Sequence, residues 1–457
     1  MEIVSRRAGV LCNHTFPVIK SDGLFARYVC DCIVNHHSPD LPTATILPHL
    51  HDVSDTWLFF DGGCEYDAIA WYHQFVLEQE VRWLFGSQSG SLSAQYMVMP
   101  QGFKAATRIA QQTLNVITAR AYAEVRIACS SAHFNYIDNH CRMNRKDDDA
   151  ALKHAFATTI KLVDADFGVL QDWSPTVSFI GSIMSIDDKG HNVALKATWA
   201  TRASTYLSAV ASAARAPMHT VAGVAVWAYR VLRLPLAHLY DTLHAVRQNN
   251  DGPSPATRVE LRECVRNITI PRTLTPVPSH IIPIAIDATP HRVAAVRWEP
   301  VPFVTPSTFP QHTIPFAEAA NRACAAIPTT TPSPAHVYAE DIPRTRINLA
   351  ELLAFLLIVH HAPPGTLLAV LSDSKVALRW MRHGIAPTRA ACNILIAITR
   401  LAYAKRIRIV LAWIAGDINP SDTFTCSGRT SGNRHTGAAL IVYQRTTERG
   451  FRVTTWL

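Results

Sequence analysis

The sequence contains no CxxC pair, and no uncharged apolar run reaches 18 residues. The 10 cysteines therefore match no zinc-binding framework, and the closest two are Cys30 and Cys32. The most apolar helix candidate, residues 351–361, is too short to span a bilayer. No secretory leader is recognised at the start of the chain, so we expect an intracellular protein with reduced thiols and no membrane association.

Charged residues are scarce at 17%, while apolar residues make up 48% of the 457 positions. This composition excludes disorder over most of the length and can fill the cores of several domains. Lysine and arginine total 43 against 35 aspartates and glutamates, which gives a net charge of +8. Such an excess favours a polyanionic partner such as a nucleic acid, although charge alone does not identify one.

The chain divides by composition into three parts. Residues 1–190 mix strand-like and helix-like segments, and residues 191–278 are first Ala-rich with helical spacing and then proline-rich and extended. Residues 279–457 alternate apolar strands with helices, which is typical of an α/β domain. Within this last part, residues 300–343 are rich in Pro and Thr and are predicted to be an insertion.

Two acidic residues of the first part have contexts that suit a catalytic site. Asp67 is followed by Tyr72-His-Gln. Asp138 lies in Tyr-Ile-Asp-Asn139, a run that predicts a tight hairpin with the acid at its tip. Asp138 alone is also explained as a turn residue. Asp61, which follows Trp-Leu-Phe-Phe, is an alternative to Asp67.

Between the two acids, Pro-Gln101-Gly102-Phe precedes a run with helical spacing over residues 104–124. The order of these segments resembles motifs A, B and C in the palm of reverse transcriptases. Two other segments agree: Pro-Val-Ile-Lys20 with Arg27-Tyr-Val resembles the fingers hairpin of that family, and Phe-Ile-Gly resembles its primer-grip turn. The resemblance implies a right-hand polymerase, with fingers and palm first and a thumb or connection in the second part.

For the chemistry, the resemblance implies phosphoryl transfer with two Mg²⁺ ions, or Mn²⁺, held by carboxylate oxygens of Asp67 and Asp138. The family has a second Asp where this chain has Asn139. An amide keeps an oxygen ligand but loses one negative charge, so we expect weaker metal binding at this position.

The resemblance also implies five residues that contact the incoming nucleotide. Tyr72 is expected to stack under the sugar and reject a ribonucleotide, and Gln101 and Gly102 are expected to line the nucleotide pocket. Lys20 and Arg27 are expected to neutralise the triphosphate, where an arginine can bond two oxygens at once.

Four acids of the last part stand at the ends of predicted elements. Asp287 and Asp373 each follow an apolar strand, Glu351 opens an apolar helix, and Asp422 ends the run Asn-Pro-Ser-Asp after a third strand. Each has an ordinary alternative, since Glu351 and Asp373 are candidates for helix caps, Asp287 for a turn and Asp422 for a solvated loop.

The set of four nevertheless resembles ribonuclease H, with Asp-Ala-Thr on a first strand, Ala-Glu-Leu on a helix, Asp-Ser on a later strand and Asn-Pro-x-Asp near the end. The resemblance implies an RNase H-like α/β domain in which Asp287, Glu351, Asp373 and Asp422 bind two Mg²⁺ ions and activate a water molecule. His435 has the place of a mobile product-release histidine, with an ordinary surface histidine as the alternative.

Polymerase followed by ribonuclease H is the gene order of retroelements. The helical segment of the second part resembles that of tyrosine-recombinase retrotransposons, the DIRS-like and VIPER-type group. The resemblances imply an RNA-directed DNA polymerase with RNase H activity, whose partners are an RNA template, a DNA primer, the RNA–DNA hybrid and dNTPs. Two alternatives stay open: a degenerate remnant that binds nucleic acid but polymerises little, and a non-catalytic binding module. The sequence predicts neither the oligomeric state nor the compartment.

Overall fold

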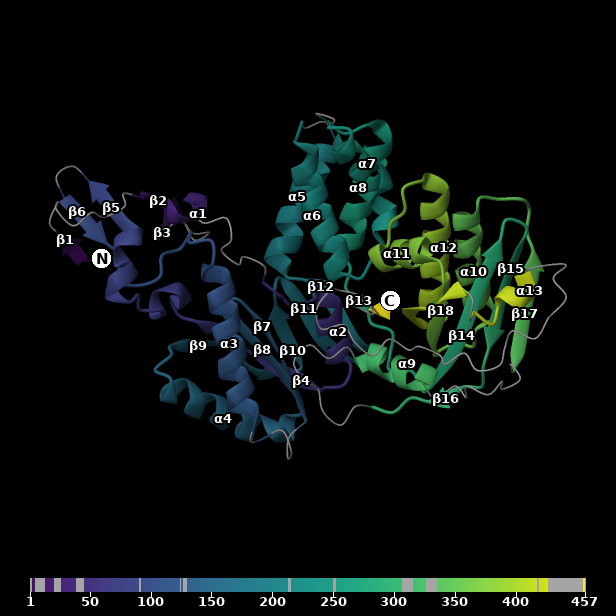
Figure 1. Ribbon diagram of the computed structural model, residues 1–457, viewed down its shortest axis with the longest axis horizontal. Helices are drawn as coiled ribbons and strands as arrows, with labels where there is room; N and C mark the ends of the chain where they lie inside the picture. The colour runs from purple at the N-terminus through teal and green to yellow at the C-terminus, as the bar shows by residue number, and fades with distance from the viewer. Residues whose placement is uncertain are drawn as a thin grey trace. The chain divides into compact units, whose positions relative to one another are not determined.

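The computed structural model describes residues 2–4, 13–19, 26–37, 45–89, 92–123, 125, 130–212, 215–249, 252–305, 315–325, 335–416, 419–425 and 455–456. The chain forms two compact units. The first comprises residues 1–49 and 60–179, and the second comprises residues 50–59 and 180–457 (Figure 1). Among the described residues, no helix is both long and apolar enough to cross a membrane.

Two small antiparallel sheets lie in the N-terminal part of the first unit (Figure 1). The predicted fingers hairpin is present as the pair β2–β3. The elements of this part are β1 (Glu2–Val4), β2 (His14–Ile19), β3 (Ala26–Asp31), α1 (Val34–His37), β5 (Gly86–Ser89), β6 (Leu92–Gln95) and the short helices η1 (Trp71–Gln74) and η2 (Gln79–Phe85).

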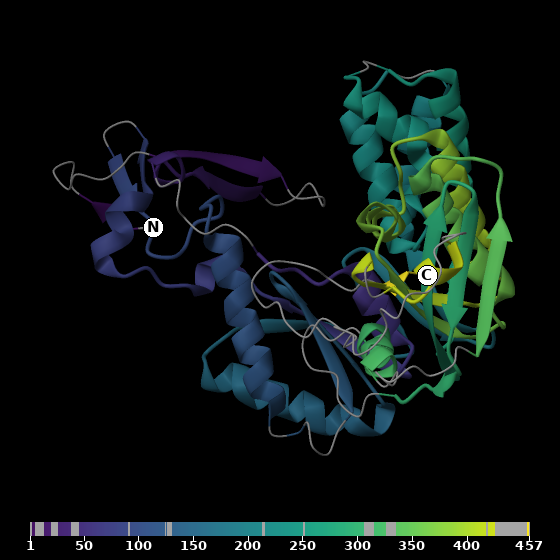
Figure 2. The same ribbon diagram turned by 45° about the vertical axis from the view of Figure 1, so that its right-hand side comes forward.

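An antiparallel sheet in the order β7-β8-β4-β9 is the centre of the first unit (Figure 2). The helix predicted over residues 104–124 is present as α3, and its apolar positions Ala110, Leu114 and Ile117 pack with Tyr66 and Phe156 in one core. The elements are β4 (Gly62–Ala68), α3 (Ala106–Ala123), β7 (Ser131–Tyr136), β8 (Asn139–Asn144), η3 (Lys146–Asp148), α4 (Asp149–Leu162), β9 (Phe167–Ser174) and β10 (Thr176–Phe179).

The second unit contains a bundle of helices (Figure 1). The members of the bundle are α5 (Ala197–Ser212), α6 (Met218–Val231), α7 (Tyr240–Arg247) and α8 (Pro255–Ile268). The same unit contains α2 (Leu50–Trp57), η4 (Leu236–Leu239) and the strands β11 (Ser182–Asp187), β12 (Gly190–Leu195) and β13 (Arg272–Thr273). Helix α8 lies in the later part of residues 191–278, which the sequence predicts to be proline-rich and extended. Ser254 caps this helix by accepting a hydrogen bond from the Thr257 amide, and a proline occupies its first position, where no amide is needed.

The rest of the second unit is built on a mixed sheet in the order β17-β15-β14-β18-β19-β20. Strand β14 pairs antiparallel with β15 and parallel with β18, and β19 continues the parallel side. The elements are β14 (His280–Thr289), β15 (Arg292–Arg297), β16 (Val301–Pro302), α9 (Pro315–Ala325), β17 (His336–Asp341), α10 (Ile347–His361), β18 (Leu367–Ser372), α11 (Lys375–His383), α12 (Arg389–Ala404), β19 (Arg408–Trp413), α13 (Asp422–Thr425) and β20 (Thr455–Trp456).

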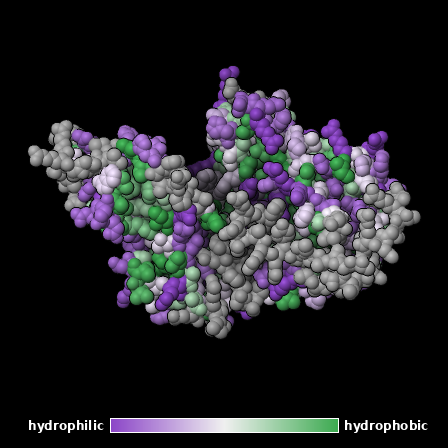
Figure 3. Space-filling model, viewed as in Figure 1, coloured by the Kyte–Doolittle hydropathy of each residue, from purple (hydrophilic) through white to green (hydrophobic). Residues whose placement is uncertain are grey.

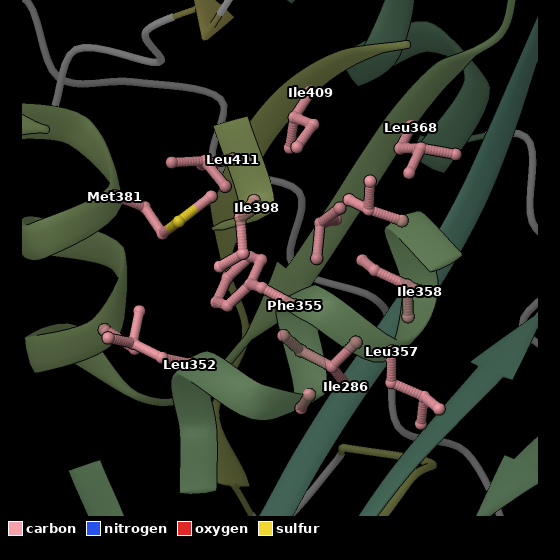
Figure 4. Packing of buried hydrophobic residues seen from close by; sticks show 14 of the residues in the cluster. Ile286, Leu352, Phe355, Leu357, Ile358, Leu368, Met381, Ile398, Ile409 and Leu411 are labelled. Atoms are coloured by element: carbon pink, nitrogen blue, oxygen red, sulfur yellow. The ribbon is translucent and has the colours of Figure 1, made fainter. Parts of the chain in front are cut away.

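One large core holds this sheet and its helices together. Figure 4 shows Phe355 of α10 between Ile286 of β14 and Ile398 of α12, with Leu411 of β19 beside them. Strand β17 pairs with β15 along its whole length and is an outer strand of the sheet. The segment predicted as an insertion over residues 300–343 therefore contributes a strand to the domain, so an insertion has to end before β17.

A buried ion network joins three segments of the second unit. The carboxylate of Asp55 on α2 accepts hydrogen bonds from the guanidinium groups of Arg233, after α6, and Arg408, on β19. The three residues are 0%, 5% and 1% exposed, respectively. Arg408 also donates to the carbonyl oxygens of Thr275 and Pro276, which fixes the proline-rich connection to the sheet.

We expect Asp55→Ala to destabilise the second unit by about 3–5 kcal/mol, because it leaves two guanidinium groups buried without their shared carboxylate. Asp188→Ala, which removes an exposed acid of the same unit, is the matched control. Urea unfolding followed by circular dichroism measures both. Equal midpoints for the two variants would show that the network does not stabilise the unit.

Candidate active sites

Three carboxylates converge at one edge of the sheet in the second unit. Asp287 lies in β14, Glu351 on α10 and Asp373 directly after β18. One oxygen of each lies within 4.8 Å of the others. The parallel register pairs Ile286 with Ser372, so the ends of β14 and β18 lie side by side and carry their acids to the same point.

The helix-cap explanations of two of these acids are wrong. Helix α10 begins at Ile347 with Arg346 at its cap, so Glu351 lies in its second turn and is only 6% exposed. The cap of α11 is Ser374, whose hydroxyl accepts a hydrogen bond from the Ala377 amide at 3.3 Å. Asp373 is therefore free to face the other two acids.

The segment after β19 contributes three further polar groups to this site. Asn419 donates to the carbonyl oxygen of Ile286 at 2.9 Å and hydrogen-bonds Asp373, and the hydroxyl of Thr425 donates to the Asp287 carboxylate. Asp422 is exposed at the start of α13 and does not belong to the group of three, but its charge raises the pKa of Asp287 and of Asp373. The sequence motif pointed to Asp422; Asn419, from the same motif, was missed.

The three acids are held in an environment that penalises their negative charges. Burial, with the charges of its two neighbours, raises the pKa of Glu351 to about 8. Burial is also the main reason that the pKa of Asp287 rises to about 6 and that the pKa of Asp373 is raised. Within the described residues, Oε2 of Glu351 and Oδ1 of Asp373 are buried and have no hydrogen-bond partner.

Buried, unpartnered carboxylate oxygens gathered at one point are the ligand set that a hard divalent cation requires. The residues present therefore fit Mg²⁺ or Mn²⁺, with Asp287, Glu351 and Asp373 as direct ligands and Asp422 beside them.

The second acidic site lies in the first unit, on neighbouring strands of the antiparallel sheet. Asp67 in β4 is in register with Asn139, the first residue of β8. The Ala68 amide donates to the carbonyl oxygen of Asp138 at 2.8 Å, so the two aspartates lie next to each other across the strands. The side-chain amide of Asn139 donates to Oδ1 of Asp138 at 3.1 Å. Asp61, the alternative, is exposed at the opposite end of β4.

The turn that carries Asp138 has a strained backbone and is hydrogen-bonded to α3. Ile137, a β-branched residue, has a φ of 60°, which such residues rarely adopt. The side chain of Gln111 on α3 accepts a hydrogen bond from the Ile137 amide at 2.6 Å and donates one to the carbonyl oxygen of Asn135 at 3.0 Å. Strain that the surroundings hold in place is typical of functional sites.

A buried polar network behind this hairpin was missed by sequence reasoning. His140 hydrogen-bonds the Tyr122 hydroxyl at 2.8 Å and the Asn135 side chain at 2.7 Å. Asn135 in turn donates to Asn115 and Thr118 of α3. Burial holds the pKa of His140 well below its usual range, so the ring is neutral. The network fixes the hairpin to α3.

The glycine of Pro-Gln-Gly-Phe has a clear structural cause. Gly102 has a φ of 106°, and a Cβ at this position would overlap the carbonyl oxygen of Cys30 in β3. The Cys30 amide donates to the carbonyl oxygen of Gln101 at 2.7 Å, and Asn35 donates to that of Gly102 at 2.8 Å. Gln101 and Gly102 are thus fixed to the fingers hairpin.

The remaining predicted residues are placed as follows. Tyr72 is half-buried in η1, and its hydroxyl lies 3.5 Å from that of Thr107 on α3. Arg27 lies in β3, but its side chain is outside the described part of the structure. Lys20 and His435 lie outside the described residues.

No protein-family model matches the sequence, and no curated protein matches it. Among solved structures, the chain is similar to the foamy viral protease-reverse transcriptase in complex with double-stranded DNA, with 12% identity and a TM-score of 0.49 over 91% of this chain and 79% of that one. The dRH form of that protein with double-stranded DNA has the same identity and TM-score, over 90% of this chain and 66% of that one. The complex with an RNA/DNA hybrid has 13% identity and a TM-score of 0.46, over 96% of this chain and 54% of that one.

This chain thus spans about two thirds of the dRH chain and about half of the hybrid-bound chain. At such identity and score the likeness carries no functional conclusion. The chain's own topology confirms the predicted fold class: an antiparallel palm-like sheet of a right-hand polymerase, followed by an RNase H-like α/β domain with the order β17-β15-β14-β18-β19.

We expect Glu351→Gln to stabilise the metal-free protein, increasingly so as the pH rises. The folded-state pKa of about 8 lies above the ordinary value of about 4.3, so the stability of the wild type is fully present at acidic pH and falls between about pH 5 and pH 8. At neutral pH the variant should gain about 1–3 kcal/mol.

Thermal unfolding in EDTA between pH 5 and pH 8 measures this difference. Glu299→Gln, at an exposed acid of the same unit, is the control. A difference between wild type and Glu351→Gln that does not change with pH would show that Glu351 titrates normally.

Proposed function

We propose that the chain is an RNA-directed DNA polymerase with ribonuclease H activity from a retroelement. The observation that carries the proposal is the cluster of Asp287, Glu351 and Asp373, with two buried oxygens that have no partner among the described residues. Together with the paired acids Asp67 and Asp138 in the other unit, it gives one chain two separate candidate sites for divalent cations. Two sites of this kind suit synthesis and cleavage of phosphodiester bonds.

In the nuclease site, Asp287, Glu351 and Asp373 would hold two Mg²⁺ ions, with Asp422 able to approach from α13. Bound Mg²⁺ supplies charge stabilisation at the scissile phosphate and lowers the pKa of a water molecule. The chain's own part is to keep the carboxylates in place: Thr425 orients Asp287 by its hydrogen bond. Release of the RNA strand from the hybrid would follow from its cleavage.

In the polymerase site, Asp67 and Asp138 would hold the metal ions, which would in turn neutralise the phosphates of the dNTP. The roles proposed for Tyr72 at the sugar, Gln101 and Gly102 at the nucleotide, and Lys20 and Arg27 at the triphosphate rest on the sequence motifs: Tyr72-His-Gln, Pro-Gln101-Gly102-Phe, and the fingers segment that contains Lys20 and Arg27. The partners that this assignment requires are an RNA template, a DNA primer and the RNA–DNA hybrid.

The finer assignments belong to the same proposal. These are the three-part division at residues 190 and 278, membership of the DIRS-like or VIPER-type elements, and an intracellular location. They are supported by the sequence patterns only.

We expect Asp287→Asn and Glu351→Gln each to lower cleavage of an RNA–DNA hybrid at least 100-fold, since each removes a metal-binding charge. Cleavage of a labelled hybrid in Mg²⁺ or Mn²⁺ measures the loss, with Asp188→Asn as the control at an exposed acid of the same unit. Cleavage that survives both substitutions would refute the nuclease assignment.

A second candidate function is a remnant that binds nucleic acid but polymerises little, and Asn139 favours it. Its side-chain amide donates to Oδ1 of Asp138, one of the oxygens that this aspartate could offer to a metal ion. The site therefore has both a lower charge and a competing donor.

Primer extension on an RNA template with dNTPs decides between the two. If the polymerase is active, extension should be present in the wild type and lost in Asp138→Ala. If the site has decayed, Asn139→Asp should raise a low activity at least ten-fold. An active wild type that loses activity in Asn139→Asp would instead show a site built around the amide.

A further inference from the structure

Two tryptophans lie against each other on the surface of the helix bundle in the second unit. Trp199 of α5 and Trp227 of α6 have ring centroids 4.9 Å apart at an interplanar angle of 40°. Trp199 is 47% exposed, which is unusual for a side chain of this size, and Trp227 is half-buried. Figure 3 shows that apolar side chains reach the surface of this bundle among polar ones.

The turn between β10 and β11 supports the inner ring. Gly181 in that turn has a φ of 75°, and a Cβ there would lie 2.8 Å from the ring atom Cζ2 of Trp227. The ring of Trp227 therefore packs directly on the backbone. Trp199 rests on this fixed ring and presents its own outer face to solvent.

Only positive charges surround the pair in the sequence. No aspartate or glutamate occurs between Asp188 and Asp241. Lys196 and Arg202 lie one turn before and after Trp199, and Arg230 lies one turn after Trp227; all three are exposed. Within the described residues none of these three cations forms an ion pair with an acid.

More cations lie near the last turn of α6. The charges of Arg230, Arg379 and Arg382 all act on His383 at the end of α11, so the last turn of α6 lies near the basic end of that helix. The tryptophan pair therefore belongs to a part of the second unit in which cations gather.

We propose that Lys196, Trp199, Arg202, Trp227 and Arg230, here called the α5–α6 face, bind single-stranded nucleic acid by stacking an unpaired base on Trp199. Exposed aromatic rings between cations bind single strands, since every unpaired base offers a flat face and every nucleotide a phosphate. A duplex hides its base faces in the stack and would meet only the cations. The site goes beyond the proposed chemistry, because binding here needs no metal.

Binding of fluorescein-labelled oligo(dT) and oligo(U) to the full chain in EDTA tests the proposal. Trp199→Ala should weaken binding of the single strands about ten-fold or more and that of a duplex of equal length less than two-fold. Trp199→Phe should recover part of the loss, because a smaller ring still stacks. Arg202→Gln should weaken both ligands and lower the salt dependence by about one charge.

Two matched variants control the experiment: Trp83→Ala removes a tryptophan that is 44% exposed in the first unit, and Arg266→Gln removes an exposed cation of α8. The unfolding temperature of Trp199→Ala should equal that of the wild type. Unchanged single-strand affinity in Trp199→Ala would overturn the proposal, as would an equal loss for the duplex. Hybrid cleavage and primer extension, measured separately in Mg²⁺, show whether the proposed function stands independently of this result.

Discussion

The burial of three neighbouring carboxylates is the constraint on which the second unit depends. Asp287, Glu351 and Asp373 are held together away from water, and burial is the largest cause of the raised pKa of each. Only a rigid framework can impose such an arrangement. The parallel pairing of β14 with β18 fixes two of the acids, and the packing of α10 in the core of Figure 4 holds the helix that carries the buried Glu351. The Asp55 network fixes the neighbouring strand β19 in the same way, by a charge that is buried and paired.

In the first unit, hydrogen bonds rather than apolar packing fix the acidic residues in place. Its acids stand on an antiparallel hairpin, whose turn is short and would be mobile if only strand pairing held it. Gln111 and the network around His140 bind the turn to α3, so the hairpin keeps Ile137 in an unfavourable conformation. One site thus depends on apolar packing around strands and a helix, and the other on buried hydrogen bonds beneath a turn.

The sequence predicts what is local and periodic. The strands β14, β18 and β19, the helix α3 and the hairpin around Asp138 follow from apolar patterns and turn residues, and they carry most of the acids. The sequence does not predict contacts between distant segments: the Asp55 network and the His140 network join residues whose partners only the fold brings near. Helix α8 was missed because the prolines before and after it suggest an extended chain, although the Ser-Pro pair at its start is a capping signal. Strand β17 was missed because proline-rich neighbours on both sides suggest an insertion.

The two acidic sites differ in the negative charge that they offer to a metal ion. Asp287, Glu351 and Asp373 are largely buried at one point, where ionised carboxylates need a positive charge, and a bound divalent cation would supply it. The pair Asp67 and Asp138 has one negative charge fewer beside it than the motif that it resembles, because Asn139 replaces an aspartate. The Asn139 side chain also donates a hydrogen bond to Oδ1 of Asp138. Above pH 8, where Glu351 is ionised, a divalent cation should therefore saturate the cluster of Asp287, Glu351 and Asp373 at a lower concentration than the pair Asp67 and Asp138. The reason is that three carboxylates at one point offer more negative charge than two aspartates, one of which already accepts a hydrogen bond from Asn139.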